Sequence, residues 1–235
     1  MTAAPQPTIS ASAPRQRGKF SYLFFAQVLL LVLFPYMEKP GLPMILFRLL
    51  GALAFFAAVY AVSERRAQWI TALILAVPAG VLNGIFAFRS DRQIAVPTLV
   101  ATILFLAFTL VSLLRAVLRS QSITHDTIYG ALSVYLLMAI VWGVAYLLVE
   151  TLQPGALSID TTRHPNHRVD WSDCMFFSFI TLATVGYGDI VPVTAHSRSL
   201  SILEAVSGTM YVAVLVARLV GLYAVSSPSR QDADN

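Results

Sequence analysis

The sequence predicts an all-α membrane protein with six transmembrane helices and one shorter helix that enters the membrane without crossing it. The composition is 57% hydrophobic and only 12% charged, whereas an average soluble domain is about 25% charged. The apolar residues also form long runs, and a helix of about 17 to 25 residues crosses the roughly 30 Å of membrane hydrocarbon. Because a segment in lipid must satisfy its own backbone hydrogen bonds, these runs are expected to be helical.

Six apolar runs are long enough to cross the membrane, at residues 20–36, 44–62, 69–88, 94–114, 128–149 and 199–223. The first follows basic residues, as in a secretory signal peptide. It is longer than a typical signal core and no small-residue cleavage site follows it, so we expect it to be retained. Pro78 and Pro97 lie inside the third and fourth runs, where each removes a helical hydrogen bond and is expected to kink the helix.

The polar link 119–127 divides the chain into two parts. We expect a disordered cytoplasmic tail over 1–19, a four-helix region over 20–126, a second helical unit over 127–225 and a short cytoplasmic tail over 226–235. The single cysteine, Cys174, excludes a disulfide within the chain, and no Cys/His cluster has zinc spacing. No serine or histidine has an evident catalytic partner, so we expect neither an enzyme nor a cofactor. The net charge of +4 does not predict nucleic-acid binding in a chain of this kind.

A short apolar segment, residues 171–183, lies between the last two runs and is too short to span the membrane. We expect a re-entrant helix here. Asp170, Ser172 and Asp173 stand at its start, and any of them can cap the exposed amide groups of its first turn. Its carboxyl end leads directly into residues 184–189, whose sequence is TVGYGD.

The TVGYGD stretch places Gly186 and Gly188 two positions apart, and both can adopt dihedral angles that a Cβ atom would forbid. The stretch resembles the signature of the potassium channel pore family, in the context of a span, a short helix, the motif and a final span over 128–225. The resemblance implies a selectivity filter in which backbone carbonyls replace the water around the ion. It implies carbonyl ligands for K⁺ from Thr184, Val185, Gly186 and Tyr187, with the filter completed by Gly188.

The resemblance also implies an assembly, an orientation and an activity. A ring of carbonyls around an ion requires four copies, so we expect a homotetramer in the cell membrane. The family's filter lies on the extracellular side, which places both termini in the cytoplasm; the positive-inside bias, nine Lys and Arg residues against seven, is too small to decide this. We expect passive, potassium-selective conduction, with K⁺ as the permeant ion. The alternatives are a weakly selective cation channel and a secondary transporter with a re-entrant loop.

Two features beside the filter bear on how it is held, and one of them departs from the family pattern. Asp189 follows the filter, where its charge would raise the cation concentration at the outer mouth, and we expect it to be unpaired and facing water. Family members commonly carry tryptophans at the positions of Phe176 and Phe177, and phenylalanine has no hydrogen to donate. The resemblance therefore does not say what braces Asp189 or the Tyr187 hydroxyl.

Residues 20–126 are expected to form a voltage-sensor-like region without sensing charges. The fourth span has no charged residue from 93 to 114, so we expect weak voltage dependence. Because ten residues follow 225 in this sequence, we expect no cytosolic ligand-binding domain in this chain. His164 and His167, before the re-entrant helix, are candidates for sensing pH or a metal, although exposed loop histidines usually do neither.

Gly208 is predicted to be the hinge of the last span. It lies in mid-span and matches the family's hinge position, twenty residues after Gly188. Thr209, Val212 and Val216 recur near it at helical spacing and are predicted to line the cavity below the filter. The alternative for Gly208 is a packing role.

Glu204 is the one carboxylate inside a predicted span, and an acid at that depth is a functional candidate. It lies about 80° from Val212 and about 140° from Thr209 around a helix, so it points away from the predicted lining. We expect it to brace the filter from behind, either protonated or hydrogen-bonded to a hydroxyl such as that of Ser178 or Thr181. The alternative is a carboxylate that faces the cavity and holds cations.

Overall fold

The computed structural model describes residues 19–33, 51, 66–88, 92–120, 124–159 and 168–226. Its helices are α1 (Lys19–Leu33), α3 (Arg66–Phe88), α4 (Arg92–Arg119), α5 (His125–Leu152), α6 (Trp171–Leu182) and α7 (Ala195–Ser226). Two short strands, β1 (Leu157–Ile159) and β2 (Ile190–Pro192), accompany them. In this part of the chain, α3, α4, α5 and α7 are long and apolar enough to cross a membrane, whereas α1 and α6 are shorter apolar helices.

The helix positions agree with the predicted runs wherever both can be compared. Each of α3, α4, α5 and α7 contains its predicted span, and α6 begins at the predicted residue and ends in a cap at Ala183. The helices α3 and α4 continue through Pro78 and Pro97, so neither is a broken helix of the transporter type. The predicted second span at 44–62 lies outside the described residues except for residue 51. The two terminal tails beyond residues 19 and 226, and the candidate sensors His164 and His167, also lie outside them.

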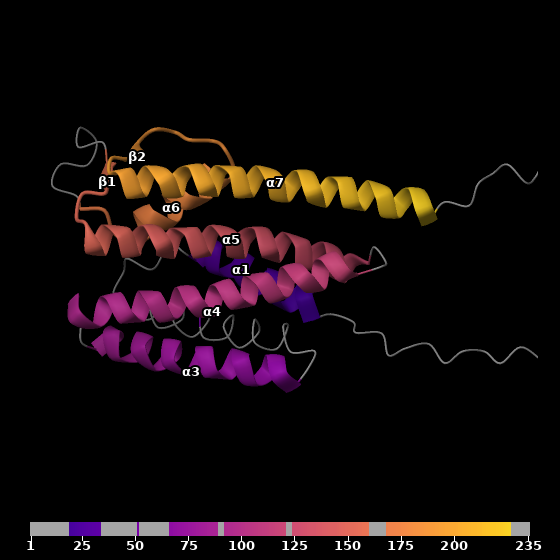
Figure 1. The fold of residues 1–235 in the computed structure, drawn as a ribbon, viewed down its shortest axis with the longest axis horizontal. Helices are drawn as coiled ribbons and strands as arrows, with labels where there is room; N and C mark the ends of the chain where they lie inside the picture. Colours follow the sequence, from indigo (N-terminus) through magenta and orange to yellow (C-terminus); the bar gives the residue numbers. More distant parts are fainter. Residues whose placement is uncertain are drawn as a thin grey trace, which may run out of the picture.

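The helix α5 is the central element of the fold. It packs against α1, α4, α6 and α7, while α3 packs on the opposite side of α4 (Figure 1). The first turn of α5 holds the start of α1, because Asp126 accepts hydrogen bonds from the amides of Phe20 and Ser21, both at 3.2 Å. Further along, Gln27 donates to the carbonyl of Ser133 at 3.4 Å. These contacts show that α1 and α5 run parallel.

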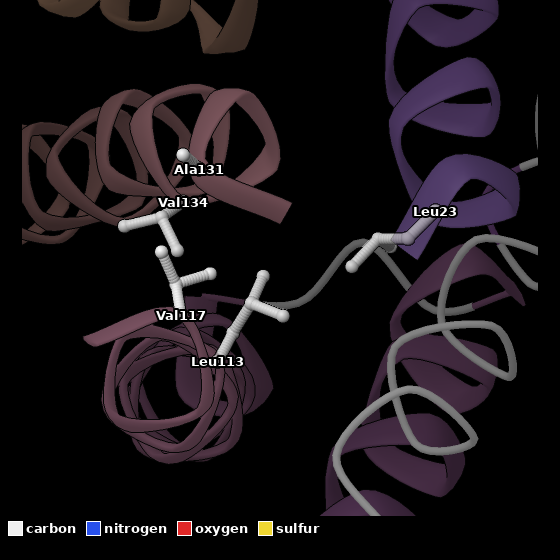
Figure 2. Packing of buried hydrophobic residues seen from close by; sticks show 5 residues of the cluster. All are labelled: Leu23, Leu113, Val117, Ala131 and Val134. Atoms are coloured by element: carbon white, nitrogen blue, oxygen red, sulfur yellow. The ribbon is translucent and has the colours of Figure 1, made fainter. Parts of the chain in front are cut away.

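A small apolar cluster joins the first helices to α5. It consists of five buried side chains from α1, α4 and α5, namely Leu23, Leu113, Val117, Ala131 and Val134. Figure 2 shows Val117 of α4 and Val134 of α5 directed toward each other, with Leu23 of α1 facing them from the side. Between helices in lipid, close van der Waals packing drives association, since the tails are as apolar as the side chains. The cluster therefore fixes α4 on α5.

A two-stranded antiparallel sheet, which the sequence analysis did not anticipate, lies at the other end of α5. Leu157 pairs with Pro192, Ser158 with Val191 and Ile159 with Ile190. Two further hydrogen bonds extend the junction, because the carbonyl of Ala156 accepts from the amide of Val193 at 2.9 Å and from the hydroxyl of Ser197 at 2.7 Å. The strands therefore attach the chain just after residue 189 to the chain just after α5.

Candidate functional site

The helix α6 is closed at its amino end by a capping box. The Asp170 side chain accepts from the amides of Ser172 and Asp173 at 2.7 and 3.1 Å, and Asp173 in return accepts from the amide of Asp170 at 2.9 Å. Asp170 and Asp173 are thus confirmed as caps, whereas Ser172 contributes its amide. The box satisfies three amide groups that the first turn would otherwise leave unpaired.

The segment after α6 has an unusual backbone in which every second residue adopts a left-handed conformation. The φ angles are 58° at Thr184, 55° at Gly186 and 80° at Gly188. The two glycines adopt the left-handed conformation predicted for them, which they can do because they have no Cβ atom. Thr184 was predicted as a carbonyl ligand, but its positive φ was not predicted, because a β-branched side chain rarely adopts positive φ and does so at a cost of about 1 to 3 kcal/mol. An alternation of this kind allows successive carbonyl oxygens to face one side of the segment.

The last turn of α6 supports the beginning of this segment. The carbonyl of Ile180 accepts from the amides of Val185 and Gly186 at 2.8 and 3.3 Å, and that of Thr181 accepts from the amide of Thr184 at 3.0 Å. Carbonyls that a helix end leaves unpaired are thus satisfied. The partial negative charge of the helix end therefore lies at the base of the segment, where it would favour a cation.

The part of the segment around Tyr187 is held by ring stacking. The rings of Phe176 and Tyr187 are parallel to within 5°, with their centroids 6.2 Å apart. Phe177 turns the other way and meets Tyr146 edge to face at 4.9 Å. Stacked and edge-to-face pairs contribute about 0.5 to 1.5 kcal/mol beyond their burial. Phe176 and Phe177 therefore contact their neighbours by aromatic packing and not by the hydrogen bond that an indole would donate.

Asp189 differs from the expectation. It was predicted to be unpaired, but its Oδ1 accepts a hydrogen bond from the amide of Ile190 at 3.1 Å and the residue is half-buried. A carboxylate can satisfy the next amide of its own chain when the backbone turns, as it does here after Gly188. Its partner is thus the first residue of β2 and not a side chain of α6.

Gly208 contacts the base of the segment closely. A Cβ atom at Gly208 would lie 2.7 Å from the carbonyl oxygen and 2.7 Å from the Cδ1 of Leu182, the last residue of α6. The same carbonyl accepts the hydroxyl of Tyr135 from α5 at 3.3 Å. Leu182 is therefore held between α5 and α7, and α7 continues as a helix through Gly208. Packing thus accounts for a glycine here, and the hinge stays a prediction.

The predicted lining residues lie on the face of α7 that other helices of the chain leave uncovered. Val212 and Val216 are 46% and 53% exposed, and Thr209 is exposed with its hydroxyl bonded to the carbonyl of Ala205 at 2.8 Å. The residues of the segment from 183 to 188 are exposed too, including Tyr187 at 72%. In the described part of the chain, the segment and the predicted lining residues are therefore both exposed.

Glu204 lies on the opposite, buried face of α7. Its Oε1 is 2.5 Å from the Oγ of Ser178 on α6, and its Oε2 is 2.6 Å from the hydroxyl of Tyr146 on α5. Ser178, and not Thr181, is thus the hydroxyl that it meets. Tyr146 was missed because nothing local in the sequence links residues 58 positions apart. A tyrosine inside a predicted span was the available signal, since its hydroxyl must find a partner there.

Known proteins match the same part of the chain. Residues 134–224, which run from α5 through α6 and the segment into α7, match a family model described as "Ion channel". In the described residues, no group of three or more His, Cys, Asp or Glu side chains could hold a metal ion. The TVGYGD segment lies within the matched residues.

Three curated relatives are potassium channels by name. A "Two-pore potassium channel 4" of Arabidopsis thaliana is 42% identical over 48 residues, which is 20% of this chain and 17% of that protein. The "Inward rectifier potassium channel Kirbac3.1" of Paramagnetospirillum magnetotacticum is 31% identical over 84 residues, 34% of this chain and 24% of that protein. The "Potassium channel protein kcv" of Paramecium bursaria Chlorella virus 1 is 30% identical over 63 residues, 26% of this chain and 67% of that protein.

The chain belongs to the potassium channel family. The viral relative carries this conclusion, because the match covers two thirds of it. The chain spans less than a quarter of the length of the plant and inward rectifier relatives. Within this potassium channel, the family match begins inside α5, so α1, α3 and α4 lie outside it. The apolar helices make it a multi-pass membrane protein.

Proposed function

We propose that the protein conducts potassium ions passively and selectively through a filter formed by residues 184–188. The observation that carries this proposal is the left-handed backbone at Thr184, Gly186 and Gly188, at the carboxyl end of a short capped helix. A filter needs several backbone oxygens directed at one dehydrated cation. The carbonyls of Thr184, Val185, Gly186 and Tyr187 would supply them, with the Thr184 hydroxyl at the innermost site.

The pore is proposed to be a homotetramer. One chain contributes one filter segment, and a closed ring of carbonyls around an ion requires four. The exposure of residues 183–188 and of one whole face of α7 supports this, because those surfaces would face the other copies and the ion path. Thr209, Val212 and Val216 would then line the cavity. Asp189 would place negative charge near the outer mouth.

We propose six spans in the cell membrane with both termini in the cytoplasm. The helix α4 runs antiparallel to α5, and Asn83 of α3 bonds to Thr102 of α4 near the connection of those two helices. The helix α1 runs parallel to α5. Helices α1 and α3 would therefore both cross outward, and the chain must then cross back between them. This supports the predicted span at 44–62. The first four spans would form a voltage-sensor-like region without sensing charges.

The proposal is tested by reconstituting the purified protein in planar bilayers and measuring the reversal potential under a potassium/sodium gradient. We expect a reversal potential close to that of potassium and resolved unitary steps. A reversal potential near zero would indicate a weakly selective cation channel. Potassium flux without unitary steps would indicate a transporter.

Gly186→Ala gives the matching test of the filter. An alanine at φ 55° is strained, so we expect the variant to lose selective potassium current. Gly84→Ala is the control, because a Cβ atom there meets nothing within 4 Å and φ is not positive. Intact selectivity in Gly186→Ala would exclude the filter assignment.

A further inference from the structure

Glu204 and its neighbours form three short oxygen–oxygen contacts, but the two neighbouring hydroxyl groups supply only two hydrogens for them. Ser178 Oγ lies 2.7 Å from the carbonyl oxygen of Ala139 and 2.5 Å from Glu204 Oε1. The hydroxyl of Tyr146 lies 2.6 Å from Glu204 Oε2. Three short contacts between oxygens therefore connect α5, α6 and α7, and each one requires a hydrogen atom.

Counting hydrogens identifies the donor in each contact. A hydroxyl carries one hydrogen, and a carbonyl carries none, so the contact with Ala139 must use the hydrogen of Ser178. The Tyr146 hydroxyl lies 2.6 Å from Oε2 and 3.4 Å from the Ser201 hydroxyl, so the shorter contact takes its hydrogen. The remaining contact, between Ser178 Oγ and Glu204 Oε1, can then be filled only by a hydrogen on Glu204. If Glu204 were ionised, Ser178 Oγ would lie close to two acceptor oxygens but could place its one hydrogen toward only one of them.

The burial of Glu204 leads to the same conclusion. Its side chain is fully buried, and in the described part of the chain its polar partners are the hydroxyls of Ser178 and Tyr146, with no cation beside it. The cationic groups on the packed helices lie near the helix ends, at His125 of α5 and at His196, Arg198 and Arg218 of α7. The groups on these helices that lie between those ends and can titrate are carboxyl groups, tyrosine hydroxyls and the buried thiol of Cys174. None of these can offset a negative charge, and an isolated buried anion is costly.

We propose that Glu204 is a neutral carboxylic acid that donates to Ser178, which completes a directed chain of hydrogen bonds from Tyr146 through Glu204 and Ser178 to the carbonyl of Ala139. This chain would fix α6 between α5 and α7, six residues before Thr184. Glu204 is thus a positioning residue for the filter, and its effect on conduction rests on the proposed channel function.

The proposal separates four variants by their hydrogen-bonding groups. Glu204→Gln keeps a donor for Ser178 and an acceptor for Tyr146, so we expect it to retain most of the potassium current. Glu204→Ala removes both, and Glu204→Asp keeps an acid but is too short to reach both partners, so we expect both variants to lose most of the current. Ser178→Ala breaks the chain in the middle and should resemble Glu204→Ala.

Infrared spectroscopy of the purified protein tests the protonation state directly, whether or not it conducts. We expect a protonated-carboxyl C=O band at neutral pH that disappears in Glu204→Gln and remains in Glu150→Gln. Glu150 is a suitable control because both its oxygens accept backbone amides, from Gly155 and Leu157 at 2.7 and 3.0 Å.

Three results would overturn the proposal: no such band in the wild type, loss of the band in Glu150→Gln alone, or loss of current in Glu204→Gln while Glu204→Asp conducts normally. A protein that shows the band but never passes potassium would leave the hydrogen-bonded chain in place and exclude the proposed function instead.

Discussion

The Cα atom of Gly208 faces the carbonyl group of Leu182, and this contact sets what an added methyl group would do. A Cβ atom would meet a backbone oxygen at 2.7 Å, and a backbone atom cannot move aside as the end of a flexible side chain can. We therefore expect Gly208→Ala to separate α7 from the end of α6 and to lower the stability of the assembly by about 1 to 3 kcal/mol. Thermal unfolding in detergent, read with potassium selectivity, measures both effects.

Gly221→Ala is the matched control for Gly208→Ala, since Gly221 lies in the same helix and a Cβ atom there meets nothing within 4 Å. We expect its unfolding temperature and selectivity to be close to those of the wild type. If Gly208→Ala has the wild-type unfolding temperature and changes only the open probability, Gly208 is a hinge and the packing interpretation is wrong.

At the scale of helices, Arg218 joins the carboxyl-terminal part of α7 to the end of α4. Its guanidinium donates from Nη1 to the carbonyl of Val117 and from Nη2 to that of Ser120. Val117 belongs to the last turn of α4, whose carbonyls have no partner within the helix, and the end of a helix carries partial negative charge. The region outside the family match is thus tied directly to the proposed pore-lining helix.

Arg218→Gln should loosen this connection. Hydrogen bonds to charged groups contribute about 1.5 to 3 kcal/mol each, although lipid and water can replace part of that. We expect a lower unfolding temperature and a changed open probability with unchanged selectivity, measured by thermal unfolding and single-channel recording. Arg218→Lys should be intermediate because an ammonium group lacks the planar fork that meets two carbonyls at once.

Arg115→Gln removes an exposed charge from the same end of α4 and serves as the control for Arg218. We expect it to behave like the wild type. Equal effects of Arg115→Gln and Arg218→Gln would indicate that surface charge, and not the contact with the α4 carbonyls, is what matters.

The elements that the sequence predicts well are those specified by neighbouring residues. The extent of α6 and its Asp170 cap follow from a short apolar run behind an acidic start, and the left-handed glycines follow from the absence of a Cβ atom. The contacts of Arg218 and Tyr146 could not be predicted in this way, because they join residues 101 and 58 positions apart. The pairing of β1 with β2 also joins segments that are far apart in the sequence. In addition, each strand has only three residues, which is too short to give a recognisable pattern.

At the scale of the whole molecule, α5 makes most of the contacts between the two parts of the chain, and Arg218 adds a direct link from α7 to the end of α4. The helix α5 contacts α1 and α4 on one side and α6 and α7 on the other (Figure 1). The cluster of Leu23, Leu113, Val117, Ala131 and Val134 holds the first side, and the Glu204 contacts hold the second. The first helices are therefore in packing contact with the helices of the proposed pore.

The membrane potential is expected to be a weak stimulus. Moving one elementary charge across the membrane contributes about 2.3 kcal/mol per 100 mV, so strong voltage dependence needs several charges that move through the field. The helix α4 has no charged residue from 93 to 114, and its basic residues at 115 and 119 lie near its carboxyl end. We expect the open probability of the reconstituted protein to change little between strongly negative and strongly positive potentials. A steep curve equivalent to several gating charges would contradict this and would place the sensing charges elsewhere. If such a curve persisted after Arg115→Gln and Arg119→Gln, the end of α4 would be excluded as its source.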